Sequence, residues 1–213
     1  MDELELLKKD WEKDDKKFPK LSYNEIYKMI LKKSSSIVKW LFIISLLEFA
    51  FWIGISFLLK GTSLSDKIEH IETDSVIIPL TIVSYIILIY FFYRFYRNYR
   101  NISVTDSSKI LMENILKTRK TVKHYVIFNL ATVVIGTFLG AAYVLKNDVN
   151  WVSRVNQASA NGEVLKFYAG LFIAAVILLT VVIIILLLFY GLIYGLLLKR
   201  LNKNYKELKK LEV

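Results

Sequence analysis

The sequence predicts an all-α integral membrane protein: a bundle of four membrane-spanning helices with cytoplasmic helical extensions. Four uninterrupted apolar runs, at residues 40–59, 75–93, 125–145 and 169–198, are separated by charged segments. At about 1.5 Å per residue, each run can cross a hydrocarbon core of roughly 30 Å. In addition, 55% of the 213 residues are apolar, which is too much for one soluble core of this length. We therefore expect lipid to surround the four runs.

Residues 1–36 precede the first run as a polar leader with nine lysines and eight acidic residues. Apolar residues at helical spacing predict a short amphipathic helix at its start. A second helix is predicted over 22–33, where Ser22 and Glu25 match a capping box. The apolar faces of the two helices consist of Leu4, Leu7, Trp11, Ile26 and Ile30. Because both helices are too short to fold alone, these faces must meet the membrane surface, the rest of the chain or a partner protein.

The membrane bundle is predicted to cover residues 37–198. Within it, residues 94–123 lie between the second and third runs and are expected to form a helical hairpin. The fourth helix should continue into a basic tail, residues 199–213, because no helix breaker follows Gly195. The four spans are placed at about 37–59, 75–96, 124–146 and 167–198.

Basic residues predict the orientation of the spans. The leader, the hairpin and the tail together carry 23 Lys or Arg, whereas the other two loops carry five. The positive-inside rule then places both termini in the cytoplasm. Anionic lipid at the cytoplasmic face is the expected partner of the basic flanks. The basic residues follow the membrane flanks and form no folded basic domain, so a nucleic-acid role is not expected.

Glu48 is the only ionisable side chain inside the four runs, and it lies near the middle of the first. It shares a helical stripe with Ser45, so this stripe should face the bundle interior. An unpaired ionised carboxylate there costs several kcal/mol, so we expect hydroxyl groups of the other spans to bind it. It could serve as a proton-responsive or substrate-binding acid, or only as an interhelical tie. The candidate polar partners at similar depth are Ser84, Thr132, Thr137 and Thr180.

Two GxxxG motifs, Gly136 with Gly140 and Gly191 with Gly195, lie on the third and fourth spans. Glycines at this spacing let helix backbones approach closely. Packing within one chain is the more frequent use, and contact with a second copy in a homo-oligomer is the alternative.

Metal and nucleophile chemistry is not expected. The chain has no cysteine, and the predicted topology puts its two histidines, His70 and His124, on opposite sides of the membrane. They cannot share a metal ion, and no catalytic set assembles on one aqueous face. The sequence therefore predicts neither a cofactor nor an enzyme.

Three stretches carry a resemblance to a protein family: MDELELLKKDW, PKLSYNEIYKMILKKSSSIVKW and KRLNKNYKELKKLE. They resemble uncharacterised bacterial four-span inner-membrane proteins, which implies the bacterial inner membrane as the location. Members of that group are labelled β-carotene monooxygenases or membrane anti-sigma factors. The first label implies a four-histidine iron site, which two histidines cannot build. The second implies a short cytoplasmic helical segment that binds a regulator, a description that residues 1–36 match.

The leading functional prediction is a non-enzymatic inner-membrane protein that holds a cytoplasmic partner through residues 1–33, in its most specific form an anti-sigma-like regulator. One alternative is a small proton-coupled transporter, because four spans with a first-span glutamate resemble small multidrug exporters. Another is an accessory subunit of a membrane complex, packed through the glycine motifs.

Overall fold

A computed structural model describes residues 22–62, 75, 77–105 and 107–211, and every regular element in them is helical. Four continuous helices are long and apolar enough to cross a membrane, the last of them combining α7, η1 and α8. This confirms the predicted all-α class with four candidate spans. Leu4, Leu7 and Trp11 of the leader lie outside the described residues. The elements are α2 (Tyr23–Leu59), α4 (Ile77–Ser103), α5 (Ser108–Asn147), α6 (Val149–Ala160), α7 (Val164–Tyr190), the π-helical turn η1 (Gly191–Gly195) and α8 (Leu196–Leu211).

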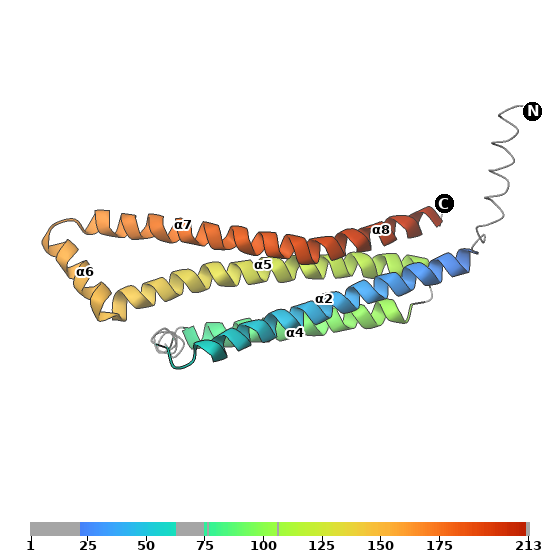
Figure 1. Ribbon diagram of the computed structural model, residues 1–213, viewed down its shortest axis with the longest axis horizontal. Coiled ribbons are helices and arrows are strands. Elements are labelled where there is room, and N and C mark those ends of the chain that lie inside the picture. Colours follow the sequence, from blue (N-terminus) through green and yellow to red (C-terminus); the bar gives the residue numbers. More distant parts are fainter. Residues whose placement is uncertain (1–21, 63–74, 76, 106, 212–213) are drawn as a thin grey trace, which may run out of the picture.

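The four long helices alternate in direction along an elongated bundle (Figure 1). The start of α2, the end of α4, the start of α5 and the end of α8 lie together at one end. At the other end, α5 and α7 extend past α2 and α4, and α6 joins them there. The described chain therefore has an even number of long crossings, with its two ends on the same side.

All buried side chains of the described residues lie in one part of the bundle, residues 23–45, 91–125 and 190–211, which we call the packed half. The described residues outside this part form the open half, in which no side chain is buried. One core cluster joins α2, α4, α5 and α8 and consists of Tyr27, Ile30, Val38, Ile102, Leu111, Ile115, Leu201 and Leu208. A second cluster consists of Leu41, Phe91, Phe95, Val122, Tyr125, Tyr190 and Tyr194.

α2 begins at the predicted capping box. The Ser22 backbone N–H donates to a Glu25 carboxylate oxygen at 2.7 Å, and the Glu25 N–H donates to the Ser22 hydroxyl at 3.3 Å. The sequence predicts a separate helix over 22–33, but the structure has one helix of 37 residues from the cap through the first apolar run. No glycine or proline interrupts the Lys- and Ser-rich segment between the two, so nothing stops the helix there.

Replacing Ser22 by alanine should destabilise α2 by about 1 kcal/mol, because an orphan N–H of the first turn loses its acceptor. The expected result is faster hydrogen exchange at the first-turn amides, with no change beyond Ser34. Ser103→Ala is the control, since the Ser103 hydroxyl donates only to the Arg100 carbonyl of its own helix at 2.9 Å. Unchanged exchange at Glu25 in the Ser22 variant would contradict the capping role.

The connection from α4 to α5 is short and is fixed by α2. The Tyr27 hydroxyl donates to the Thr105 carbonyl at 3.1 Å, a buried contact between residues far apart in the sequence. The sequence suggests Thr105 or Asp106 as the cap of α5. The structure instead places Ser107 at the cap position without a side-chain hydrogen bond, and Thr105 is buried. Asp106 lies outside the described residues.

Side-chain amides tie the helices together within the packed half. Asn98 on α4 donates to Thr121 on α5 at 3.1 Å, and Asn204 on α8 donates to Ser34 on α2 at 3.0 Å. All four residues are buried, and no buried polar side-chain atom of the described residues lacks a partner. Because an unpaired amide would be costly there, these pairs favour one register of the helices.

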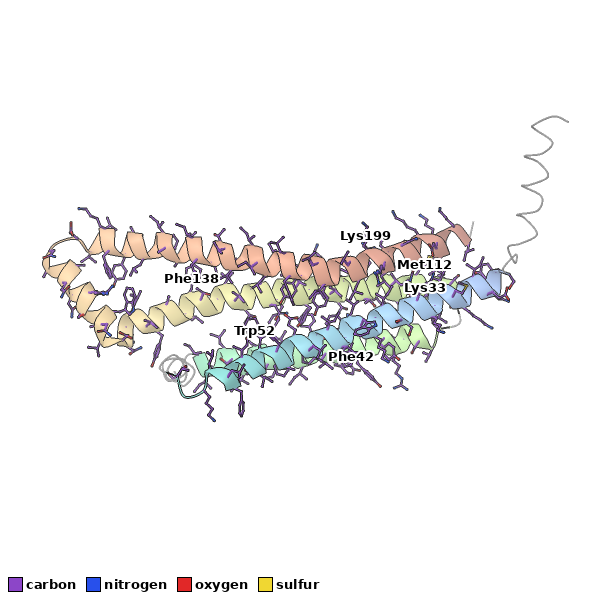
Figure 2. All side chains as sticks on the ribbon, viewed as in Figure 1. Lys33, Phe42, Trp52, Met112, Phe138 and Lys199 are labelled. Carbon is purple, nitrogen blue, oxygen red and sulfur yellow. The ribbon has the colours of Figure 1, made fainter. Side chains whose placement is uncertain are left out.

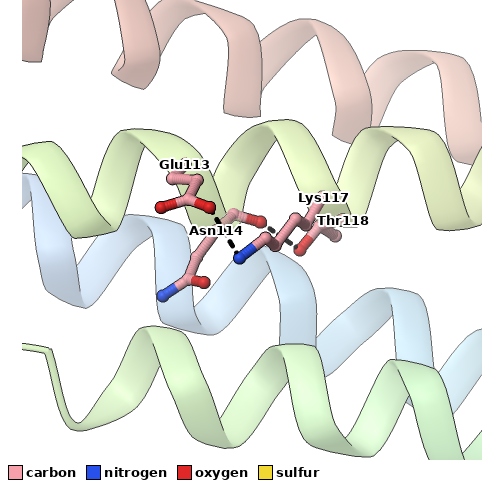
Figure 3. A network of polar contacts seen from close by, with 4 residues as sticks. All are labelled: Glu113, Asn114, Lys117 and Thr118. Atoms are coloured by element: carbon pink, nitrogen blue, oxygen red, sulfur yellow. Dashed lines mark hydrogen bonds and ion pairs between the residues drawn. The ribbon is translucent and has the colours of Figure 1, made fainter.

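α5 carries different chemistry on its buried and its exposed face, and Figure 3 draws one contact from each. On the buried face, the Thr118 hydroxyl donates to the Asn114 carbonyl at 2.8 Å. On the exposed face, Lys117 and Glu113 form an ion pair at 2.7 Å. More than half of each charged side chain is exposed to solvent, so this ion pair contributes little to stability.

α6 occupies the segment between the third and fourth long helices, which the sequence suggests is a loop. Asp148 caps it, because its carboxylate accepts the backbone N–H groups of Asn150 and Trp151 at 3.0 and 3.4 Å. The Arg154 guanidinium lies 5.3 Å from the centre of the Trp151 ring. α6 connects the far ends of α5 and α7, which lie apart from each other there (Figure 1).

Candidate functional site

Glu48 on α2 is bound by three tyrosine hydroxyls. Tyr190 donates a short hydrogen bond to Oε1 of the carboxylate. Tyr125 and Tyr194 donate to Oε2 at 2.9 and 3.2 Å. Since Tyr125 belongs to α5 and the other two tyrosines flank the junction of α7 and η1, this one carboxylate connects three of the four long helices.

Aromatic packing holds the phenol groups in position. Tyr125 and Tyr194 are each only 1% exposed, and their ring centres are 5.9 Å apart. Phe95 and Phe91 of α4 contact the Tyr125 ring edge-on, at centre distances of 5.4 and 5.7 Å. α4 therefore supports the site through ring packing, without donating a hydrogen bond to the carboxylate.

Tyr190 ends α7, and Tyr194 lies within η1, the π-helical turn. A π turn adds one residue to a turn of helix, and it is often found where a helix carries a functional group. Glycines occupy both ends of η1, at Gly191 and Gly195. Tyr190, just before the π-helical turn, and Tyr194, inside it, both donate to the Glu48 carboxylate.

The site consists of hydrogen-bond donors, and no basic side chain of the described residues forms an ion pair with its carboxylate. An ionised carboxylate accepts hydrogen bonds only, so three O–H donors match it. A protonated acid would also need to donate, and one phenol would then have to turn from donor to acceptor. In the part of the chain that the structure describes, no three His, Cys, Asp or Glu side chains gather to hold a metal ion.

The structure does not pair Glu48 with the hydroxyls expected from the sequence. Those of Ser84, Thr132, Thr137 and Thr180 each donate to the backbone carbonyl four residues earlier in their own helix. That prediction is wrong because these short side chains bond to their own helices and do not reach a neighbouring one. Ser45 on the Glu48 stripe is buried as expected, and its hydroxyl donates to the Phe42 carbonyl at 2.8 Å.

Among the described residues, the glycine motifs form no close helix contacts. A Cβ atom added at Gly136, Gly140, Gly191 or Gly195 would have no neighbour within 4 Å. Gly136 and Gly140 instead line an apolar groove of about 730 Å³ between α5, α6 and α7. Phe138, labelled in Figure 2, lines the same groove. The more frequent use of such motifs, packing inside one chain, is therefore not the one seen here.

The apolar residues of the second leader helix pack on the chain itself. Ile30 is 3% exposed within the first core cluster, and Ile26 packs against that cluster. Ile26 and Ile30 therefore contact the rest of the chain. The membrane surface and a partner protein were the other two surfaces that the sequence allowed.

Comparison with protein families gives one match. A family model described as a domain of unknown function, DUF8845, matches residues 24–213. Searches against curated proteins and against solved structures found no match. The matched range contains α2 from its second residue, every other helix described above, and all four residues of the Glu48 site.

Proposed function

Because this chain belongs to the family described as a domain of unknown function (DUF8845), we propose its function from its own geometry. It is a non-enzymatic protein of the bacterial inner membrane that holds a cytoplasmic partner through its N-terminal leader. The packed half is the platform that carries the leader, and an anti-sigma-like regulator is the most specific form of this proposal.

The distribution of charge supports a cytoplasmic packed half. Eighteen described Lys and Arg residues lie in the packed half and four in the open half. By the positive-inside rule, the packed half with both described chain ends then faces the cytoplasm. The exposed apolar surface of the open half faces lipid. Because lipid covers this surface, the open half needs no buried core of its own.

The continuity of α2 is the observation that carries the proposal. One unbroken helix leads from the Ser22 cap, at the tip of the packed half, into the first span. Whatever binds the preceding residues is therefore joined directly to a membrane helix. Because Ile26 and Ile30 are used internally, residues 1–21, with Leu4, Leu7 and Trp11, are the segment left for the partner.

Removing residues 1–21 should abolish capture of that partner. The full chain and the shortened chain, which starts at the Ser22 cap, would be purified by affinity in mild detergent, and the co-purifying proteins identified. A full-length variant with Leu4, Leu7 and Trp11 changed to serine should lose the same protein. Ile110→Ser is the control, because Ile110 is 51% exposed in the packed half and outside the leader.

Identical co-purifying proteins from all these variants would overturn the proposal. A protein captured equally with and without residues 1–21 would instead favour an accessory subunit, docked on the glycine-lined grooves. That result is informative because the shortened chain keeps every described helix.

The Glu48 site favours a second candidate function, proton-coupled transport. Protonation of the carboxylate would change the hydrogen bonds that connect α2, α5 and α7, and so couple a proton to helix packing. Tyr190 and Tyr194 also line a groove of about 690 Å³ beside the site. Glu48→Gln tests this candidate: unchanged drug tolerance and growth, with unchanged fold, would rule it out.

A further inference from the structure

A groove of about 660 Å³ lies between α2 and α8 in the packed half, apart from the Glu48 site. Four basic side chains line it, Lys32 and Lys33 from α2 with Arg200 and Lys203 from α8. Figure 2 labels Lys33 within this part of the bundle. The hydrogen bond from Asn204 to Ser34 joins the two helices beside the groove, so its walls are fixed relative to each other.

Among the residues that the structure describes, no acidic side chain lines this groove. Glu207, one turn further along α8, approaches Lys203 only at 3.9 Å, and the Lys203 side chain is largely exposed. Four like charges on facing helices repel one another, and an anion between them removes that repulsion. The groove therefore has the charge of an anion-binding site.

The groove lies at the level where the apolar runs begin and end. On α2 its basic residues lie seven and eight residues before the first run, and on α8 they lie two and five residues after the fourth. Met29 and Ile37 add apolar surface to its lining. A site with cations at the polar boundary and apolar side chains beside them matches a phospholipid better than a fully soluble anion.

We propose that this groove binds the phosphate headgroup of one anionic phospholipid of the inner leaflet. The four basic side chains hold the phosphate, while Met29 and Ile37 contact the start of an acyl chain. The site joins α2 to α8 through a lipid and requires a specific pair of helix faces, unlike general attraction of basic flanks to a charged membrane. It rests on the membrane setting proposed above and is independent of any leader-bound partner.

Lipid retention by the full chain tests the site. The protein would be reconstituted in nanodiscs of phosphatidylcholine alone or mixed with phosphatidylglycerol, and the bound lipid counted by native mass spectrometry. One retained phosphatidylglycerol, preferred about tenfold over phosphatidylcholine, is expected. Changing Arg200 and Lys203 together to glutamine should reduce retention on the order of tenfold, and changing Lys32 and Lys33 should do the same.

The matched control removes the same charge elsewhere on α8. Lys209 and Lys210 are exposed in its last turn and do not line the groove, so changing both to glutamine should alter retention less than about twofold. Helix content by circular dichroism should be the same in all variants, because every changed side chain is exposed.

Two results would overturn the proposal. Equal losses in the groove variants and the control would show diffuse attraction along the basic segments. Binding of inorganic phosphate to the detergent-purified chain that phosphatidylglycerol does not displace would show that the groove takes a soluble anion.

Discussion

Replacing Glu48 by alanine is expected to lower the free energy of unfolding by about 2–4 kcal/mol. Three phenol groups from two other helices lose their acceptor at once, and each interhelical hydrogen bond in a membrane protein contributes roughly 0.6 to 1.7 kcal/mol. Unfolding in mixed detergent, followed by tyrosine fluorescence or by steric trapping, would measure the change. The loss should be greatest for contacts between α2 and the pair α5 and α7.

Single changes at the site should give graded results. Tyr125→Phe and Tyr190→Phe each remove one hydrogen bond and keep the packed ring, so each should cost about 1 kcal/mol. Thr180→Ala is the control, because its hydroxyl donates only within its own helix at 2.7 Å. A Glu48→Ala variant no less stable than Thr180→Ala would show that the carboxylate does not hold the helices together.

Replacing Leu201 by alanine should lower the free energy of unfolding by about 2–5 kcal/mol. Leu201 is 0% exposed in the core cluster that joins α2, α4, α5 and α8, so truncation leaves a cavity among four helices. The same substitution at Leu192, which is 64% exposed, should change stability by less than about 0.5 kcal/mol. Both variants replace leucine by alanine on one continuous helix. Thermal unfolding of the two variants in the same detergent would measure the difference in stability.

Similar losses at Leu201 and Leu192 would contradict the assignment of Leu201 to a buried core and of Leu192 to the exposed surface of the same helix. Such a result would mean that the surface around Leu192 is covered, for example by a second copy of the chain. The stability of the packed half would then not depend on its own core.

The sequence was sufficient for the long helices because their signals are local. Apolar runs of span length and the absence of a breaker after Gly195 predicted four long helices and the continuation of the last through Leu208. The Ser22 capping box likewise depends on residues three apart. α6 was missed because its apolar content is low, although Asp148 before a potential helix was an available N-cap signal.

Serines and threonines expected at the same depth in the membrane were the only partners predicted for Glu48, so the prediction missed the three tyrosines. Short hydroxyl side chains bond to their own helix, whereas a phenol reaches across to a neighbour. Tyr190 and Glu48 lie equally far from the inner ends of their runs, a correspondence that the sequence does contain. The position of Tyr125 depends on tertiary packing with Phe95, and that of Tyr194 on packing with Tyr125, which no local pattern specifies.

The π-helical turn between α7 and α8 sets how far α8 is rotated about the helix axis relative to α7. An extra residue in a helix with 3.6 residues per turn rotates everything beyond it by about 100°. The exposed apolar side of α7 and the core-facing side of α8, with Leu201 and Leu208, are thus aligned independently of each other. Two related chains differing by a single residue in this turn would present different sides of their tails to the bundle, even if every other position were identical.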